Sequence, residues 1–426
     1  MIDIETEYSE LSLFLQEHNV LVPEKDLDTY AMIESVFERN NPSTAFYIIN
    51  LGEIVRQYKL WHELFPYIKP CYAVKCNPNK VICQLLSILG VGFDVASKNE
   101  INLVKDYVSD MDKVIYANPY KESSSVQYAR AIDVDTSVFD SEDELYKIKT
   151  YHPKCKLLMR IKVDDKNSLC KFSEKFGVDI EDEAEQLLTL SKYMNLNVVG
   201  VSFHVGSGCM DATQYYRALE QCKAVFAIGA KIGYNFNMID IGGGFPGFHD
   251  DKSLELLHNI SAQVELGFKD FFSKSYHIIN SKFETNDANP ILHLISEPGR
   301  FFVQSSHTLL INVIGRKIKN IKQKNDDIIK NFYYNMNDGI YGSFNCMIFD
   351  HQIPELLPYN ERNGEKYESV VYGPTCDSVD KICASVKLPE LAIGEWCFIK
   401  NFGAYTVAAA SDFNGFSKLK AFYIFN

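Results

Sequence analysis

The chain has 426 residues, which is enough for two or three domains with large cores. A formal net charge of -13 without a basic stripe argues against a nucleic-acid partner, and no apolar run reaches the ~18 residues of a membrane span. The first ten residues are acidic and do not look like a secretory signal. Eleven scattered cysteines without a C-x-x-C pair, and histidines without an H-E-x-x-H spacing, predict a cytoplasmic protein with reduced thiols and no metal site.

Predicted strands and helices alternate in the middle of the chain. After an N-terminal piece to about residue 44, Thr44–Asn50 reads as a strand and Leu51–Tyr67 as an amphipathic helix. Amphipathic segments such as Ile180–Met194, with Asp179 as a candidate cap, then separate short apolar runs. The eight apolar runs are Cys71–Val74, Val91–Val95, Lys113–Ala117, Thr136–Phe139, Lys156–Val163, Val198–Phe203, Asn237–Ile241 and Ile291–Ser296. Eight such units predict an α/β fold with a parallel, closed (β/α)8 barrel.

The character of the sequence changes after about residue 300. Segments rich in Val, Ile, Phe and Tyr follow one another without a helical period, which predicts a mostly antiparallel β domain. The predicted domains are residues 1–44 as an N-terminal part of the β domain, 45–300 as the barrel and 301–426 as the C-terminal β domain.

Lys75 is the first candidate for chemistry. It follows the apolar run C-Y-A-V directly and precedes Cys76, Asn77 and the breaker Pro78. A lysine at the mouth of a barrel can have a lowered pKa, and a more nucleophilic amine of this kind suits Schiff-base chemistry with a carbonyl or with pyridoxal phosphate. A lysine that extends into water is the alternative, and it is the commoner fate of this residue.

The other predicted strands also end on reactive or phosphate-binding residues. Because active sites of (β/α)8 barrels lie at the carboxyl ends of the strands, these ends are expected to form one site. The strand ends are Lys75, Asp94, Asn118, Asp140, Arg160, His204, Gly242–Gly244 and Glu297.

Three stretches on this rim suit a phosphorylated cofactor. The glycines of I-D-I-G-G-G-F-P-G leave backbone N–H groups free for a phosphate, although a turn without a ligand is an equal alternative. In S-F-H-V-G-S-G, His204 can lie on an aromatic ring and Ser207 can bind a phosphate. In S-E-P-G-R, Glu297 can accept a hydrogen bond from a ring nitrogen, while Gly299 and Arg300 assist with the phosphate. The alternative for Glu297 is a structural ion pair with Arg300 or Arg160.

These motifs, taken in order, resemble the eukaryotic-type ornithine decarboxylases, which are pyridoxal-phosphate enzymes of the alanine-racemase-like fold. The resemblance runs from about residue 30 to the C-terminus. It rests on Y-A-V-K-C-N, F-D-V-A-S-K-N-E, F-H-V-G-S-G, D-I-G-G-G-F-P-G, E-P-G-R, N-D-G-I-Y-G-S-F-N, G-P-T-C-D and G-A-Y-T-V-A-A-A-S. It implies a barrel, a β domain built from both chain ends, and a homodimer with shared active sites.

The resemblance also implies roles for individual residues. Lys75 matches the Schiff-base lysine, His204 the residue stacked on the cofactor, and Glu297 the partner of its ring nitrogen. Asp338 and Asp377 match residues that bind the substrate, and Cys376 the proton donor, the last two reaching the site from the partner subunit. Residues that match the remaining cofactor ligands are Asp94, Arg160, Ser207, Gly244, Gly299, Arg300 and Tyr405.

Other members of this group of enzymes stay as alternatives. A decarboxylase of lysine or arginine shares the cofactor half of the site, and a non-catalytic antizyme-binding relative shares the fold. Relatives that act on arginine carry another residue at the position of Asp338, so the N-D-G aspartate favours ornithine. The stretch Lys121–Leu145 is acidic where antizyme-regulated members are basic, which puts antizyme binding in doubt.

Overall fold

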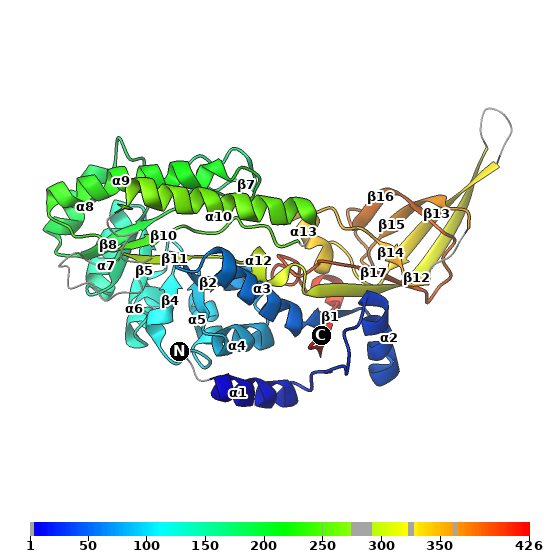
Figure 1. The fold of residues 1–426 in the computed structure, drawn as a ribbon. Helices are drawn as coiled ribbons and strands as arrows, with labels where there is room; N and C mark the ends of the chain where they lie inside the picture. Colours follow the sequence, from blue (N-terminus) through cyan, green and yellow to red (C-terminus); the bar gives the residue numbers. More distant parts are fainter. Residues whose placement is uncertain (1–3, 249, 274–291, 323–327, 361–363) are drawn as a thin grey trace. The chain divides into compact units, whose positions relative to one another are not determined.

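The structure is a computed structural model that describes residues 4–248, 250–273, 292–322, 328–360 and 364–426 (Figure 1). The chain divides into two compact units. The barrel unit comprises residues 56–302, and the sheet unit comprises residues 1–55 together with 303–426.

The barrel unit contains a closed ring of eight parallel strands. Neighbours in the ring follow the order β10-β11-β2-β3-β4-β5-β6-β8, so the ring closes between β10 and β8. The strands are β2 (Lys69–Ala73), β3 (Gly92–Val95), β4 (Val114–Tyr116), β5 (Thr136–Phe139), β6 (Lys156–Arg160), β8 (Asn197–Ser202), β10 (Met238–Asp240) and β11 (His293–Ser296). All eight coincide with the predicted apolar runs, and the predicted (β/α)8 barrel is confirmed; residue 291 of the last run lies outside the described residues.

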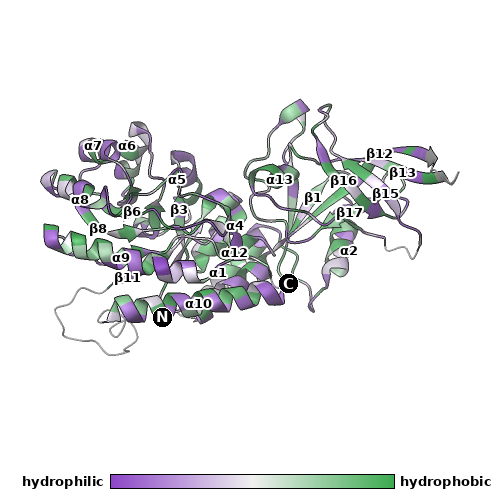
Figure 2. Cartoon of the chain, turned by 90° about the horizontal axis from the view of Figure 1, so that it is seen from above, coloured by the Kyte–Doolittle hydropathy of each residue, from purple (hydrophilic) through white to green (hydrophobic). Residues whose placement is uncertain are grey.

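Amphipathic helices connect the barrel strands, as the alternating green and purple residues of α9 and α10 show in Figure 2. The connecting helices are α4 (Lys80–Ile88), α5 (Lys98–Val104), α6 (Ser123–Ala131), α7 (Glu142–Tyr151), α8 (Ala184–Tyr193), α9 (Thr213–Ile232) and α10 (Asp251–Phe271). In addition, α3 (Leu51–Leu64) precedes the first barrel strand and the short α12 (Arg300–Val303) follows the last one. Inside the ring, the buried side chains of Cys71, Ile115, Val138 and Leu158 pack together. Burial of these apolar groups holds the strand ends in fixed positions.

Helix α8 begins later than the predicted Ile180. Asp179 and Glu183 instead form a turn of their own, because the Asp179 N–H donates to the Glu183 carboxylate at 2.9 Å. The Glu181 N–H in turn donates to the Asp179 side chain at 3.2 Å. These local side-chain bonds compete with the helix, so Asp179 caps a turn and not α8.

The sheet unit contains an eight-stranded sheet with the order β14-β17-β12-β13-β15-β16, while β1 joins β12 to β18. Pairings are antiparallel except for β1 with β18 and β13 with β15, which confirms the mostly antiparallel β domain. The strands are β1 (Phe46–Asn50), β12 (His307–Lys322), β13 (Ile328–Met336), β14 (Leu357–Pro358), β15 (Tyr367–Tyr372), β16 (Lys381–Leu388), β17 (Trp396–Ile399) and β18 (Lys420–Ile424). The helices are α1 (Ile4–Glu17), α2 (Thr29–Asn40) and α13 (Cys346–Phe349).

Strand β1 differs from its predicted place in the barrel domain. It pairs antiparallel with β12 and parallel with β18, so residues 45–55 belong to the sheet unit. All five β1 residues are buried, and a strand buried on both faces has the same apolar sequence in either architecture. The pattern alone therefore did not distinguish the two sheets.

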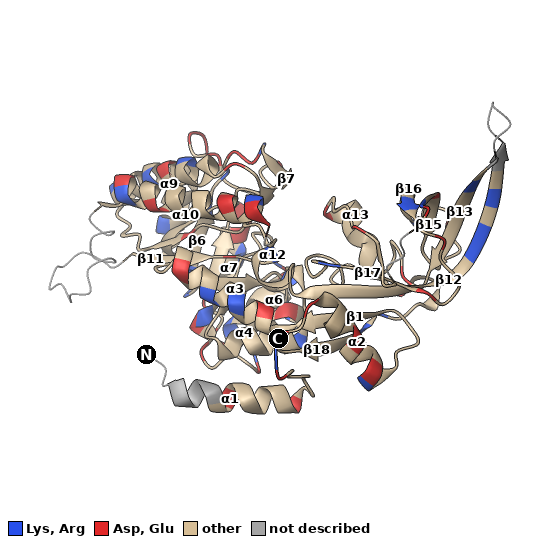
Figure 3. Cartoon of the chain, turned by 45° about the vertical axis from the view of Figure 1, so that its right-hand side comes forward, with Lys and Arg blue, Asp and Glu red and all other residues tan. Residues whose placement is uncertain are grey.

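Charges lie mainly on the outward-facing helices and loops. Figure 3 shows Lys or Arg and Asp or Glu side by side on the helices of the barrel unit, and Lys or Arg along β12 of the sheet unit. Over the described ranges, the structure contains no helix that is both long and apolar enough to cross a membrane.

Candidate active site

Lys75 lies at the carboxyl end of β2, in a single 3-10 turn formed by Val74–Cys76. Its Nζ donates a hydrogen bond to Oδ2 of Asp94 at 2.7 Å. The Lys75 side chain is 41% exposed, whereas that of Asp94 is 1% exposed. Strands β2 and β3 pair directly, with Ala73 opposite Asp94. A buried carboxylate therefore positions an accessible amine on the rim of the barrel.

Glu297 follows β11 and is buried beside Asp240, the last residue of β10. Burial raises the pKa of Glu297 well above its ordinary value, and the nearby charges of Asp240 and Asp94 raise it further. A hydrogen bond joins the carboxyl groups of Glu297 and Asp240. The two carboxyl groups therefore share a proton, and the Asp240 side chain also accepts from the Gly242 N–H at 2.9 Å and from Ser202 at 3.3 Å.

His204 follows β8 and is held as a neutral imidazole. Desolvation lowers the pKa of His204 well below its ordinary value, with further contributions from the charges of Arg160 and Lys75. Nδ1 of His204 accepts a hydrogen bond from the Gly206 N–H at 3.0 Å, which leaves the proton on Nε2. The ring of Phe172 meets the imidazole edge-on, with centroids 4.9 Å apart. The hydrogen bond and the aromatic contact together fix the orientation of the imidazole.

A glycine turn and a buried Ser–Arg pair form a binding place for an anion on the same rim. Gly242 and Gly244 have φ angles of 63° and 107°, which disfavour any other residue. A Cβ at Gly244 would lie only 2.7 Å from the Gly206 carbonyl oxygen. Across the turn, the Arg300 guanidinium donates to Oγ of Ser207 at 3.2 Å, and both side chains are buried. Backbone N–H groups, a hydroxyl and a guanidinium suit a phosphate group.

Gly299 and Arg160 complete the barrel side of the predicted site. A Cβ on Gly299 would lie 2.9 Å from the Cβ of Cys76, so the loop after Glu297 packs tightly on the turn that carries Lys75. Arg160 is the last residue of β6, and its guanidinium carbon lies 4.9 Å from the ring centroid of Phe176. The structure therefore brings all the predicted barrel residues to one end of one barrel.

The remaining predicted residues, Asp338, Cys376, Asp377 and Tyr405, belong to the sheet unit, and the structure describes them within that unit. Asp338 is buried at a cavity of about 350 Å³ that Tyr341 and Thr375 also line. Its carboxylate accepts from the N–H groups of Gly339 at 2.8 Å and Ser343 at 3.2 Å. Desolvation nevertheless raises the pKa of Asp338 to about 6.

Cys376 and Asp377 lie on an accessible turn. The Tyr341 hydroxyl donates to the Asp377 carboxylate, and this bond lowers the pKa of Asp377. The Tyr341 ring in turn stacks on Phe413 with a centroid distance of 4.2 Å. Cys376 is exposed, and its backbone N–H donates to the Asn414 side chain at 3.0 Å.

Tyr405 has a left-handed backbone with φ of 57°. This conformation is unusual for a bulky residue and costs of order 1–3 kcal/mol, so the surrounding structure must compensate for it. Strain of this kind concentrates at functional sites. The backbone conformation thus supports Tyr405 as a functional residue, independently of its sequence motif.

Sequence reasoning missed two carboxylates. Asp240 lies inside the apolar run I-D-I, where an acid between two isoleucines is the only signal. Asp380 is buried and accepts from the Ile340 N–H at 2.8 Å, the Thr375 N–H at 3.0 Å and the Thr375 hydroxyl at 2.7 Å. It therefore ties the loop of Asp338 to the turn of Cys376.

Comparison with known proteins gives a consistent family. The family "Pyridoxal-dependent decarboxylase, pyridoxal binding domain" matches residues 51–304. Ornithine decarboxylase of Schizosaccharomyces pombe is 41% identical over 409 residues, which cover 93% of this chain and 88% of that protein. Antizyme inhibitor 2 of Xenopus laevis is 36% identical over 96% of this chain and 88% of its own length.

Solved structures agree with these sequence relatives. The arginine decarboxylase of Paramecium bursaria Chlorella virus, bound to agmatine, has a TM-score of 0.84 at 33% identity and covers 93% of this chain and 100% of its own. The rim residues fit the cofactor that the family description names, because an accessible amine, an anion-binding turn and a buried acid lie together at one barrel end. The chain therefore belongs to the pyridoxal-dependent decarboxylases, and its cofactor is pyridoxal phosphate.

Proposed function

We propose that this protein decarboxylates L-ornithine to putrescine and CO2, a reaction of polyamine biosynthesis. One observation carries the proposal: the accessible amine of Lys75 stands 2.7 Å from buried Asp94 on the rim that also holds Glu297 and the glycine turn. The 41% identity to an ornithine decarboxylase over most of both chains supports the choice of substrate.

The barrel residues hold the cofactor in this proposal. When bound, pyridoxal phosphate supplies an acceptor for the electron pair that remains as CO2 leaves. Lys75 would provide the amine that anchors it, Asp94 would orient that amine, and His204 would contact the ring. Glu297 would pair with the ring nitrogen, and Arg160 would bind the phenolic oxygen. The barrel residues Ser207, Gly244, Gly299 and Arg300 would bind the phosphate, and the sequence motif adds Tyr405 of the sheet unit as a further ligand.

The sheet-unit residues act on the substrate in this proposal. Ornithine carries a second ammonium group, which requires a carboxylate partner when it leaves water. Asp338 and Asp377 supply that charge. Cys376 returns a proton from its Sγ to the substrate α-carbon after CO2 has left, and exclusion of water around the substrate carboxylate favours its loss.

The proposed assembly is a homodimer with two shared sites, in which Cys376 and Asp377 complete the site of the partner subunit. The exposure of Cys376 in the single chain is consistent with a residue that a partner covers. The proposed location is the cytoplasm, since all eleven cysteines are free thiols.

Two alternatives have specific support. Arginine is the first, because the viral relative is an arginine decarboxylase, but its identity is lower at 33%. The second is a non-catalytic protein like antizyme inhibitor 2. Retention of Lys75, Asp94 and Glu297 favours an enzyme.

The charge of the 121–145 surface bears on antizyme binding, for which regulated relatives have a basic surface. The side chain of Lys121 is only 1% exposed and pairs with Glu144 at 2.9 Å, so this lysine adds no positive charge to the acidic 121–145 surface.

A substrate panel tests the proposal. The purified protein is loaded with pyridoxal phosphate and assayed for CO2 release from ornithine, lysine and arginine side by side. The expected order of kcat/KM is ornithine, then lysine, then arginine. One extra methylene costs only ~1–3 kcal/mol, so weak lysine turnover is expected. A higher kcat/KM for arginine contradicts the assignment, and cofactor binding without any turnover favours the non-catalytic alternative.

A further inference from the structure

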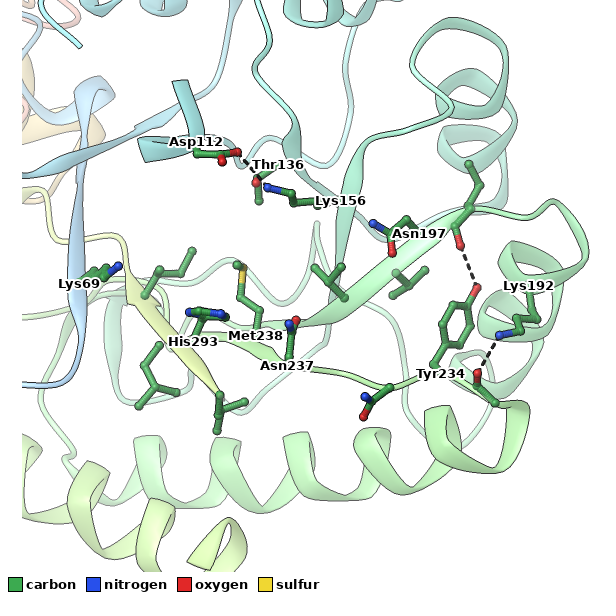
Figure 4. A pocket seen from close by; sticks show the side chains of 18 of the residues that line it. Lys69, Asp112, Thr136, Lys156, Lys192, Asn197, Tyr234, Asn237, Met238 and His293 are labelled. Atoms are coloured by element: carbon green, nitrogen blue, oxygen red, sulfur yellow. Dashed lines mark hydrogen bonds and ion pairs between the residues drawn. The ribbon is translucent and has the colours of Figure 1, made fainter. Parts of the chain in front are cut away.

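A cavity of about 1050 Å³ lies at the amino ends of the barrel strands (Figure 4). The first residues of several strands line it, among them Lys69 of β2, Lys156 of β6 and His293 of β11. The same three strands lead to Lys75, Arg160 and Glu297 at their other ends. A five-residue strand spans roughly 16 Å, so this cavity is separate from the candidate active site.

Positive charge converges on this cavity. Its lining includes Lys69, Lys156, Lys192 and His293, and among the described lining residues Asp112 is the single carboxylate. The pKa of His293 is lowered by desolvation and further by the charges of Lys69 and Lys156. Both lysines are therefore close enough to His293 to disfavour its protonated form. Three lysines at one cavity are notable in a chain with a net charge of -13.

Two of these lysines have partners among the described residues. Lys192 donates to the Gly233 carbonyl at 2.7 Å and lies over the Tyr234 ring at 4.5 Å, so it offsets the carbonyl end of α9. Lys156 pairs with Asp112 at 2.9 Å in an exposed ion pair, which contributes little and exchanges readily with another anion.

Figure 4 shows the hydrogen-bond donors of the cavity in two groups. Lys69, Lys156 and His293 surround one open space, whereas Lys192 lies at the far end beside Tyr234. Asn197 and Asn237 extend the lining between these two ends and add amide donors. Ammonium, imidazole and amide donors around a cavity of this size suit a small polar anion more than an apolar molecule.

We propose that this cavity binds a small multivalent oxyanion, such as a phosphorylated or polycarboxylated metabolite, through Lys69, Lys156 and His293. An anion bound there lies at the starts of the strands whose ends carry the candidate active-site residues. The proposal is independent of which amino acid the protein decarboxylates.

The probes are inorganic pyrophosphate and citrate, titrated into the cofactor-loaded protein at constant ionic strength set with sodium chloride. Isothermal titration calorimetry measures affinity, and NMR follows the His293 ring, assigned with His293→Gln. We expect saturable binding and an increase of the His293 pKa, because an anion favours the protonated imidazole. The probe that binds more tightly distinguishes phosphate from carboxylate chemistry.

Variants that remove lysine charges test whether the anion binds in this cavity. Lys69→Gln with Lys156→Gln should weaken binding by about tenfold or more, since two charge-assisted contacts are lost. Lys192→Gln is the matched control in the same cavity and should change affinity less than about threefold, because its ammonium already has partners. Thermal unfolding of each variant confirms that it is folded. Absence of saturable binding, or an equal loss in the control, overturns the proposal.

Discussion

A hydrogen bond joins the carboxyl groups of Glu297 and Asp240 inside the barrel, and burial raises the pKa values of both groups, that of Asp240 to about 6. The negative charge of Asp240 makes Glu297 a stronger base, and a strong base keeps a hydrogen-bonded ring nitrogen protonated. Asp240 is thus expected to act through Glu297 as a positioning residue.

Asp240→Asn should therefore keep cofactor binding but lower kcat by about tenfold or more, which corresponds to ~1.4 kcal/mol in the barrier. The ¹⁵N shift of the cofactor ring nitrogen should move toward the unprotonated value. Ser202→Ala removes only a neutral donor to Asp240 and serves as control. An unchanged nitrogen shift in Asp240→Asn contradicts this role.

Lys75→Ala should abolish decarboxylation and the visible absorbance of anchored cofactor, because the variant has lost the amine on the rim. Lys69→Ala, at the start of the same strand, is the control and should retain the absorbance. Mass spectrometry after borohydride reduction locates the attached cofactor. Attachment at another lysine in the Lys75→Ala variant contradicts the assignment.

Asp338 should give the reaction a pH dependence near 6. Its carboxylate becomes protonated as the pH falls through about 6, so the KM for ornithine should rise there. The effect on stability has the opposite sign. Because the pKa of Asp338 in the folded state exceeds the ordinary value of 3.8, protonation of Asp338 should raise the free energy of unfolding as the pH falls from about 6 toward 4.

Profiles of KM between pH 5 and 8 and of unfolding between about pH 4 and 8 check both signs for Asp338. In Asp338→Asn the rise in KM below pH 6 should disappear, while the KM at neutral pH increases. A KM profile that keeps the same inflection in the variant assigns the titration to another group, for which Asp240 is the candidate.

Mixed dimers test the shared site. Lys75→Ala and Cys376→Ala proteins should each be inactive. An equal mixture should recover up to about a quarter of the total wild-type activity, because random exchange makes about half of the dimers mixed and each mixed dimer has one intact site out of two. Tagged subunits and native mass spectrometry measure the exchange. Continued inactivity despite complete exchange contradicts a site built from both subunits.

Asp380 should be required for the geometry of the loops that carry Asp338 and Cys376. Asp380→Ala removes three hydrogen bonds to a buried carboxylate and should destabilise the sheet unit by ~2–4 kcal/mol. Urea unfolding measures this loss. Glu368→Gln, whose carboxylate bonds to Ser385 on the surface, is the control and should change stability by less than ~1 kcal/mol.

The barrel could be predicted because each of its strands is short, apolar and followed by a polar residue at the rim. The same signal did not place Phe46–Asn50, because a strand buried on both faces is apolar in either sheet. Asp240 was missed because its partner Glu297 is 57 residues away and only the closed ring brings them together. Asp380 was missed because it acts by accepting hydrogen bonds from the backbone N–H groups of Ile340 and Thr375. No sequence pattern reports the positions of such backbone groups.

Strand β1 pairs with β18, although more than 360 residues separate them along the chain. During synthesis, all strands of the barrel ring leave the ribosome before β18 does, so the barrel unit can fold while the pairing of β1 with β18 is still missing. Until then the buried residues of β1 have one unpaired edge, which is a hazard for aggregation. Protease protection of ribosome-bound chains of increasing length should therefore appear first in residues 56–302 and only at full length in residues 46–50.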